Sequence, residues 1–247
     1  MTGKVYLVGG GPGDPDLITV KGLELLRCAD VVLYDHLVAP QLLNETPETA
    51  ELIAVGKKAG EHSLGQGEID ALLVAKAQTN QVVVRLKGGD PFVFGQGGEE
   101  CQALAQAGVP FEVVPGVSSA FAVPAYAGIP LTHRDLASQF TVVTARDQDG
   151  HLPDWENLPH RGTLIFLMGM ARLAEIAAGL QAHGWSPQTA VAVIHRGTTP
   201  QQQVVVGTLA GIAEQAAHLQ SPGTIVVGDV VSLNASIRWF EPDIAFS

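Results

Sequence analysis

Short apolar runs alternate with amphipathic segments along the first half of the chain. Runs rich in Val, Leu and Ile predict buried strands at 4–8, 30–33, 52–55, 82–86 and 111–114. Segments with helical spacing predict helices at 19–29, 68–78 and 99–106, and a further one that begins after Ser118 and ends near Gly128. This alternation is typical of βαβ units, which build a largely parallel sheet.

The periodicity breaks at residues 130–135 and then starts again. The broken stretch begins with Pro130 and has no strand or helix pattern, so we place a linker there and expect domains at 1–132 and 133–247. Strands are predicted at 140–144, 163–167, 190–194, 203–206 and 224–227, and helices at 171–183 and 209–218. Several connections are too brief for crossover helices, so the second sheet is expected to be mixed. The fold class is therefore α/β with two α/β domains.

Composition and charge narrow the possible partners. The chain is 46% hydrophobic and 16% charged, which is enough apolar material for real cores. Its net charge of −11 disfavours nucleic acid and anionic lipid, so an anionic ligand would have to meet a local basic cluster. No run approaches the ~18 apolar residues of a membrane span, and the N-terminus lacks a secretion-signal pattern. With only Cys28 and Cys101, the pattern predicts a cytoplasmic protein without a disulfide framework.

Two glycine-rich loops follow predicted strands. The segment 9–14 occupies the position of a dinucleotide fingerprint, but it lacks the third glycine, and Pro12 removes a backbone amide. Taken alone it is more often a structural turn. The segment 87–95 is the stronger signal, since Gly88 and Gly89 permit close approach of a ligand, Asp90 offers acceptor oxygens, and two phenylalanines add apolar surface.

Other chemical signatures are missing. The chain contains no GxSxG, HExxH or GxxxxGK[ST] motif, and its eight histidines are scattered, so neither a hydrolase triad nor a metal site is predicted. The pair Glu99 and Glu100 is interpreted as the acidic first turn of a helix, where it suits the helix dipole.

Taken together and in order, the loops resemble those of the tetrapyrrole methylase family and, within it, the uroporphyrinogen-III C-methyltransferases. The resemblance runs essentially from end to end. It rests on VGGGPGDPDLITVKG at 8–22, ADVVLYDHLV at 29–38, VGKKAG at 55–60, RLKGGDPFVFGQGGEE at 85–100, VPGVSSAFAVPAYAGIPLTHR at 114–134 and GTTPQQQ at 197–203. Such an ordered set is far more specific than one glycine loop.

This resemblance implies two α/β domains of the tetrapyrrole methylase type, with S-adenosylmethionine in the cleft between them, and a homodimer. It also implies methylation of uroporphyrinogen III at C2 and then C7 to give precorrin-2, on the path to sirohaem or cobalamin. No segment is left over for dehydrogenation or iron chelation, so the chain is expected to be the methyltransferase alone.

Carried over position by position, the resemblance also implies the site residues. Asp35 matches the family's proposed proton acceptor, and Lys57 matches its proposed proton donor. The methyl donor is expected to contact Pro12, Gly88, Gly89, Asp90, Val93, Ser118, Ser119, Met168 and Gly197. A basic patch for the substrate carboxylates is expected from His133, Arg134 and Arg146.

Two departures from the family pattern bear on the substrate. Relatives often have arginine where this chain has Gln96, and glycine-histidine where it has Ala145 and Arg146. The change at Gln96 removes a cation that could meet a substrate carboxylate, and Arg146 introduces a cation elsewhere. The contacts to the substrate carboxylates are therefore expected to be rearranged.

Three alternatives remain open. Another tetrapyrrole methylase, such as a precorrin-4 methyltransferase, is the nearest, although the YDHLV and GGDPFVFG segments favour the uroporphyrinogen enzyme. A nicotinamide dehydrogenase would need the fingerprint that the first loop lacks. A non-catalytic tetrapyrrole-binding module is disfavoured because Asp35, Lys57 and the GGD segment are all retained.

Overall fold

The computed structural model describes residues 2–56, 64–146 and 149–241, and it divides the chain into two compact units, Met1–Ser118 and Ser119–Ser247. This division falls earlier than the boundary predicted at 132/133. The reason is that helix α5 (Ser119–Tyr126) packs against strands of the second unit's sheet, so it belongs to that unit although it precedes the predicted linker.

The first unit contains a five-stranded parallel sheet with the order β3-β2-β4-β1-β5. Its strands are β1 (Lys4–Gly9), β2 (Val31–Tyr34), β3 (Glu51–Ala54), β4 (Val82–Lys87) and β5 (Phe111–Val114). Its helices are α1 (Val20–Leu26), α2 (Pro40–Leu43), α3 (Gln66–Thr79) and α4 (Gly97–Gln106), with a 3₁₀ turn at Pro15–Leu17. All five strands lie within a residue or two of their predicted positions.

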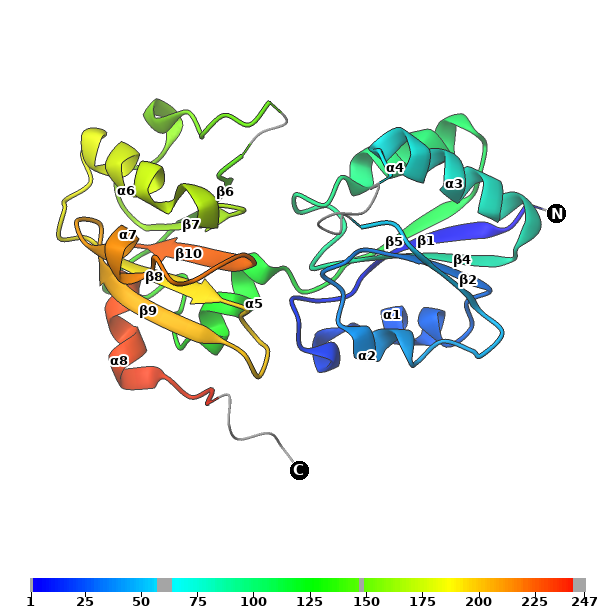
Figure 1. Cartoon of the computed structure of the whole chain (residues 1–247), viewed down its shortest axis with the longest axis horizontal. Coiled ribbons are helices and arrows are strands. Elements are labelled where there is room, and N and C mark those ends of the chain that lie inside the picture. The colour runs from blue at the N-terminus through cyan, green and yellow to red at the C-terminus, as the bar shows by residue number, and fades with distance from the viewer. Residues whose placement is uncertain (1, 57–63, 147–148, 242–247) are drawn as a thin grey trace. The chain divides into compact units, whose positions relative to one another are not determined.

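Both faces of this sheet are covered by helices (Figure 1). Val5 and Leu7 point to the face that packs on α3 and α4, whereas Val8 points to the face that packs on α1 and α2. Because both of their faces are covered, the inner strands β1 and β2 consist almost entirely of apolar residues, which is why the sequence located them well.

The second unit contains a mixed sheet with the order β6-β7-β10-β8-β9. Its strands are β6 (Phe140–Thr144), β7 (Thr163–Leu167), β8 (Ala190–His195), β9 (Gln203–Thr208) and β10 (Gly223–Val227). Its helical elements after α5 are α6 (Leu173–Ala182), α7 (Ile212–Gln215), α8 (Asn234–Ile237) and 3₁₀ turns at Trp155–Asn157, Met170–Arg172 and Asp229–Leu233. Only β6 and β7 pair in parallel, and β10 is antiparallel to both of its neighbours, so the prediction of a mixed sheet is confirmed.

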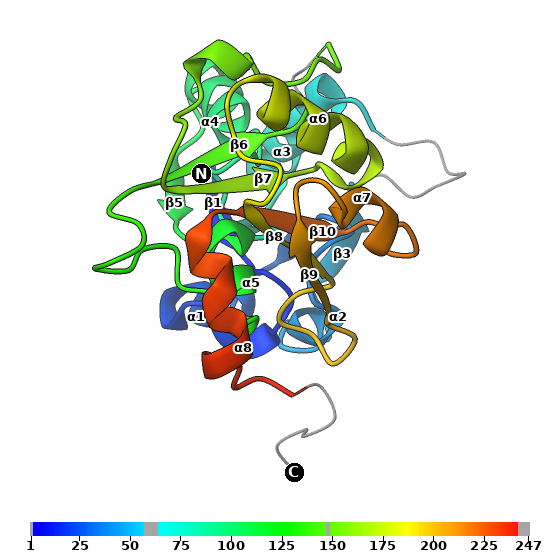
Figure 2. The same cartoon turned by 90° about the vertical axis from the view of Figure 1, so that its left-hand side faces the viewer.

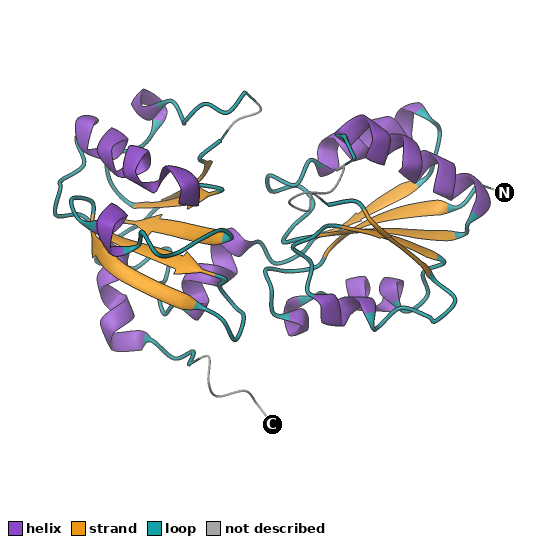
Figure 3. Ribbon diagram, in the orientation of Figure 1, coloured by secondary structure: helices purple, strands orange, loops and turns teal. Residues whose placement is uncertain are grey.

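Helices also cover both faces of the second sheet, with α6 and α7 on one side and α5 and α8 on the other (Figures 2 and 3). Leu180 of α6 and Ile212 of α7 pack into one core cluster, and Val123 of α5 packs with Ile194 into another. Helix α7 is much shorter than the helix predicted at 209–218, because the amide of Leu209 bonds to Thr189 and only the residues from Ile212 onward coil.

An exposed ion-pair cluster ties β1 and α1 to β5 in the first unit. Glu112 accepts hydrogen bonds from Lys21 and from Lys4, the latter at 2.6 Å, and these bonds, that of Lys21 first, lower the pKa of Glu112 from 4.5 to about 2. A carboxyl with a depressed pKa in the folded state stabilises the fold at neutral pH, and this contribution is lost as the pH falls from 4.5 to about 2.

We therefore expect Glu112→Gln to lower the free energy of unfolding slightly at pH 7, because surface pairs are individually weak. The difference from the wild type should shrink below pH 4.5 and vanish near pH 2. Urea unfolding at a series of pH values measures it, and a difference that stays constant down to pH 2 would contradict the assignment.

Candidate active site

The two glycine-rich loops meet at the carboxyl edge of the first sheet. The amide of Gly10 donates to the carbonyl of Lys87 at 2.7 Å, and Gly11 and Gly89 exchange backbone hydrogen bonds of 3.3 and 2.7 Å. These amides of the first loop are thus used by the second loop. The structure thereby explains why the first loop departs from the dinucleotide fingerprint, whose amides must remain available for a pyrophosphate.

Three glycines make this contact possible. A Cβ on Gly9 would lie 2.5 Å from the Cα of Gly116, and a Cβ on Gly116 would lie 2.3 Å from the carbonyl oxygen of Gly89. Gly89 also has φ +66°, a conformation that other residues adopt at a cost. These glycines are therefore required by backbone packing, independently of any ligand.

Gly88 is different, because its surroundings do not require a glycine. A Cβ there would make only ordinary contact, 3.4 Å from the Cβ of Leu37, and its φ is not positive. Nearby in sequence, Phe92 and Phe94 are 59% and 45% exposed, and Leu37 is 62% exposed. This edge thus combines backbone that a ligand can approach closely with apolar side chains exposed around it.

Asp90 joins the second glycine loop to the segment after β5. One of its carboxylate oxygens accepts from the amide of Phe92 at 2.8 Å, and the other accepts from the amide of Gly116 at 3.0 Å. The side chain is half-buried, so the expectation of an aspartate free to serve a ligand has to be corrected: it also holds the turn together. Its contact with the methyl donor stays a prediction.

Asp35 follows β2 and is held at the same carboxyl edge. Its amide donates to the carbonyl of Leu86 at 3.1 Å, and its Oδ1 accepts from Nη2 of Arg85 at 2.5 Å. The Asp35 side chain is 29% exposed, whereas that of Arg85 is 3% exposed. The carboxylate therefore reaches solvent on one side and is oriented by a buried guanidinium on the other.

Arg85 belongs to a buried network that the sequence reading missed. Oε1 of Glu100 accepts from Nε of Arg85 at 3.0 Å and from Nζ of Lys87 at 2.8 Å. Glu99 and Glu100 do lie in the acidic first turn of α4, as predicted, but the pattern did not show that the Glu100 side chain is 0% exposed and paired with these cations. A signal for this network was present in the sequence. Arg85 and Lys87 are two residues apart in the central strand β4, so their side chains point to the same face of the sheet.

Backbone strain gathers at the carboxyl ends of strands. Among the described residues, those other than glycine with positive φ are Phe94, Gln96, Met168, Arg196 and Thr198. The first two follow β4, Met168 directly follows β7, and the last two follow β8. Strained residues of this kind concentrate in functional sites, so they mark the same ends of the strands as the glycine loops do.

In the second unit, Met168, Gly197 and Arg146 lie at one edge of the sheet, because β6, β7 and β8 all run in the same direction. Met168 is 54% exposed. Gly197 is buried, and a Cβ there would lie 2.4 Å from Val123, so packing alone demands glycine. The following loop is held by Gln202, which accepts from the amide of Thr198 at 2.8 Å.

The structure does not bring His133 and Arg134 together with Arg146. The two former residues lie in the loop that leads into the amino end of β6, where Thr163 of β7 donates to the carbonyl of Leu131 at 2.8 Å. Arg146 follows the carboxyl end of β6. The expected single basic patch is therefore not formed within this unit, because the length of β6 separates its members.

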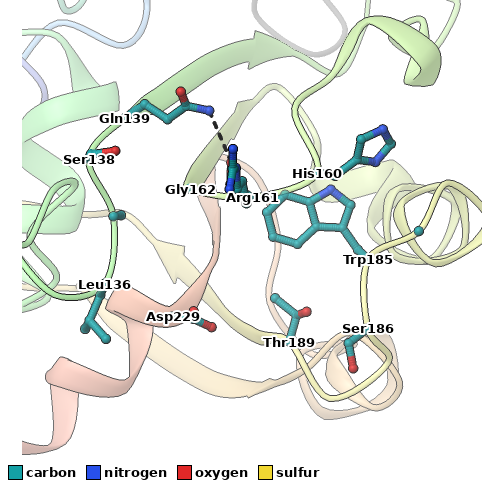
Figure 4. Close-up of a pocket in the computed structure, with 12 residues that line it drawn as sticks. Leu136, Ser138, Gln139, His160, Arg161, Gly162, Trp185, Ser186, Thr189 and Asp229 are labelled. Atoms are coloured by element: carbon teal, nitrogen blue, oxygen red, sulfur yellow. Dashed lines mark hydrogen bonds between the residues drawn. The ribbon is translucent and has the colours of Figure 1, made fainter.

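A hollow of about 580 Å³ lies at the amino ends of β6, β7 and β8 in the second unit (Figure 4). Ser138, His160, Arg161, Trp185 and Thr189 are among the residues that line it. It occupies the edge opposite to Met168 and Gly197, and the residues that line it include none of those predicted to contact the methyl donor.

The remaining predicted site residues are placed as follows. Pro12 and Val93 are half-buried in the two glycine-rich loops, Ser118 is buried at the end of the first unit, and Ser119 begins α5. Lys57 lies outside the described residues. In the described part of the chain, no helix is both long and apolar enough to cross a membrane, and no group of His, Cys, Asp and Glu is arranged to hold a metal ion.

The buried cysteine, Cys101, is not a reactive site. Burial raises the pKa of the Cys101 thiol, and the neighbouring Glu100 raises it further, while Lys87 opposes them. A thiol in such surroundings is a poor nucleophile, because the thiolate is the reactive form. Cys28 is exposed and free.

Comparison with known proteins assigns the chain to a family. Residues 4–213 match the family described as Tetrapyrrole (Corrin/Porphyrin) Methylases. The chain belongs to the tetrapyrrole methylase family.

The curated relatives that match the chain include siroheme synthases. Over 240 residues the chain is 51% identical to siroheme synthase 2 of Aeromonas hydrophila, a match that covers 96% of this chain and 51% of that protein. The chain thus spans about half the length of the curated relatives it matches.

Solved structures of methyltransferases have a similar fold. Uroporphyrin-III C-methyl transferase from Thermus thermophilus, complexed with S-adenyl homocysteine, is 43% identical with a TM-score of 0.82, and the match covers 93% of each chain. A cobalt precorrin-4 methyltransferase is 32% identical with a TM-score of 0.81, covering 92% of this chain and 95% of that one.

Proposed function

We propose that this chain is an S-adenosylmethionine-dependent uroporphyrinogen-III C-methyltransferase that methylates C2 and then C7 to give precorrin-2. The observation that carries the proposal is the carboxyl edge of the first sheet. There the Asp35 carboxylate, oriented by Arg85, lies two residues from Leu37, which borders the open backbone of Gly88. A proton acceptor and a ligand cradle are thus adjacent.

The residues present fit the methyl donor. At Gly88 a Cβ would make only ordinary contact with Leu37, so packing does not demand glycine there and a ligand can approach the bare backbone closely. When bound, S-adenosylmethionine supplies a methyl group on a positively charged sulfur, which an electron-rich pyrrole carbon can attack directly. Further donor contacts are proposed for Pro12, Gly89, Asp90, Val93, Ser118, Ser119, Met168 and Gly197.

The protein's own contribution is alignment and proton removal. Exposed Phe92 and Phe94 offer apolar faces to the pyrrole rings, and alignment of two reactants accounts for a large part of most enzymatic rate enhancements. After methylation a ring proton must leave, and Asp35 is the proposed acceptor. Lys57 is the proposed proton donor, and His133, Arg134 and Arg146 are proposed to contact substrate carboxylates at separate places.

Incubation with uroporphyrinogen III and S-adenosylmethionine without oxygen, followed by mass spectrometry, tests this function. The expected product carries two added methyl groups. Transfer to a precorrin-4 substrate with none to uroporphyrinogen III would favour the nearest alternative, which is supported by a solved relative but at lower identity. Donor consumption that never occurs with any tetrapyrrole would favour a binding module.

The proposed assembly and setting follow from the same resemblance. We propose a homodimer in the cytoplasm that binds neither nucleic acid nor membranes, in agreement with a net charge of −11. Light scattering of the purified protein measures the assembly. Whether the product continues to sirohaem or to cobalamin is set by the enzymes that follow.

A substitution at Gln96 tests whether the side chain at this position contacts a substrate carboxylate. It is exposed at the start of α4, and its backbone already has φ +57°, so arginine would add no new strain relative to glutamine. We expect Gln96→Arg to lower the Michaelis constant for uroporphyrinogen III, since a hydrogen bond to a charged group contributes ~1.5–3 kcal/mol. Gln102→Arg, also exposed on α4, is the matched control and should leave the constant unchanged. An unchanged constant in both variants would rule out a carboxylate contact at position 96.

A further inference from the structure

A buried charge network lies behind Asp35, and of its members only Arg85, which contacts Asp35 directly, has been given a role above. Arg85 and Lys87 of β4 have side chains that are 3% exposed, and Glu100 of α4 is 0% exposed. Ions lose their hydration when they are buried, and apolar residues of similar size often stabilise a core equally well or better. Stability alone therefore gives no reason for charges here.

The contacts lead in one direction, toward Asp35. Glu100 accepts from Nε of Arg85 at 3.0 Å, and Nη2 of the same guanidinium donates to Asp35 at 2.5 Å. A guanidinium is planar and rigid, so a partner that fixes Nε also fixes the direction in which Nη2 points. The position of Glu100 is thereby transmitted to the carboxylate of Asp35.

Lys87 completes the arrangement from the other side. Its Nζ donates to the same Oε1 of Glu100 at 2.8 Å, so one oxygen serves both cations. With Asp35 included, the network contains two cations and two anions. Oε2 of Glu100 is buried and has no hydrogen-bond partner in the described part of the chain, which is unfavourable for a carboxylate kept only for stability.

We propose that Glu100 and Lys87 are positioning residues, which hold Arg85 and through it the Asp35 carboxylate in the orientation needed for proton removal. This inference rests on the proposed function of Asp35. The two residues touch neither substrate nor donor in this scheme, and their effect passes entirely through Arg85.

A cycle of variants tests the coupling through turnover. We expect Glu100→Gln to lower kcat by roughly 10-fold, with the Michaelis constant and donor affinity unchanged, because coupled neighbours typically interact at this level. In an Asp35→Asn background the same substitution should cause no further loss, since both act on one group. Equal losses in both backgrounds would overturn the proposal. Glu99→Gln, an exposed neighbour on α4, is the matched control and should keep full turnover.

A measurement without turnover separates this inference from the proposed function. The carboxyl carbon resonance of Asp35, assigned by its loss in Asp35→Asn, should shift or broaden in Glu100→Gln and stay unchanged in Glu99→Gln. An unchanged resonance in Glu100→Gln overturns the positioning role even if the enzyme is active. If the wild type does not methylate uroporphyrinogen III, the proposed function fails, and the resonance still decides whether Glu100 orients Asp35.

A second variant covers the case in which Glu100→Gln does not fold. Lys87→Met combined with Glu100→Gln removes one charge of each sign, so no unpaired ion is left in the core. It should show the same resonance change and the same lack of additivity with Asp35→Asn. Full turnover together with an unchanged resonance in this double variant overturns the proposal.

Discussion

Asp35→Asn is expected to reduce turnover by ~10²–10⁴-fold, the usual cost of removing a general base. Asparagine keeps the shape of the side chain, and its carbonyl oxygen can still accept from Nη2 of Arg85, so orientation is preserved while basicity is lost. The steady-state rate at which uroporphyrinogen III is converted to the doubly methylated product measures the effect.

Donor affinity provides the internal control for this prediction. Calorimetry with S-adenosyl homocysteine should give the same affinity for Asp35→Asn and for the wild type, because the side chain is proposed to serve the tetrapyrrole. Asp16→Asn, at an exposed aspartate in the 3₁₀ turn Pro15–Leu17 that follows the first glycine-rich loop, should keep full turnover. Near-normal turnover in Asp35→Asn with intact donor binding would reduce Asp35 to a residue that positions a pyrrole ring or the following turn.

The local pattern of apolar residues was sufficient to locate the strands and to select the loops expected to bind ligands. Val31–Tyr34 is buried on both faces and β4 begins with three valines, so apolar runs mark these strands without any knowledge of the tertiary fold. Loops that follow such strands share the carboxyl edge of a parallel sheet, which is why the second glycine loop and Asp35 could be expected at the same edge.

Other features depend on contacts between distant segments. Arg85 and Glu100 are bonded across the packing of β4 against α4, and no local pattern relates them. The boundary at 118/119 likewise follows from the packing of α5 against the second sheet. The sequence pattern shows only that a helix ends before residue 130, and not which sheet that helix packs against. The single basic patch was predicted because Arg134 and Arg146 are near in sequence. They lie at opposite ends of β6, so the strand keeps them apart.

Asp90 shows how one residue can satisfy two explanations. Its place after a strand is compatible with a ligand contact and with an aspartate-capped turn, and its bond to the amide of Phe92 shows such a turn. Its bond to the amide of Gly116 joins a distant segment, which spacing could not reveal. Gly116 is informative for the same reason, because it contacts the two loops through Gly9 and Gly89 and through its hydrogen bond to Asp90.

Gly116→Ala is expected to destabilise the first unit by at least ~1–3 kcal/mol, the usual cost of overpacking. The added Cβ would lie 2.3 Å from the carbonyl oxygen of Gly89 and 2.6 Å from the Cα of Gly9. Both neighbours are backbone atoms in hydrogen-bonded strand ends and loops, so they cannot move aside as a flexible side chain would. Urea unfolding measures the loss, and donor affinity should fall with it because the second glycine loop must shift.

Gly67→Ala is the matched control for this prediction. Gly67 lies on α3, is exposed, and has nothing within 4 Å of a built Cβ, so alanine there should be neutral or stabilise the helix by ~0.5–1 kcal/mol. The contrast between the two variants isolates the steric effect from the general effect of replacing a glycine. If Gly116→Ala unfolds at the same urea concentration as the wild type and binds the donor normally, the contact among the three glycines does not hold the two loops together.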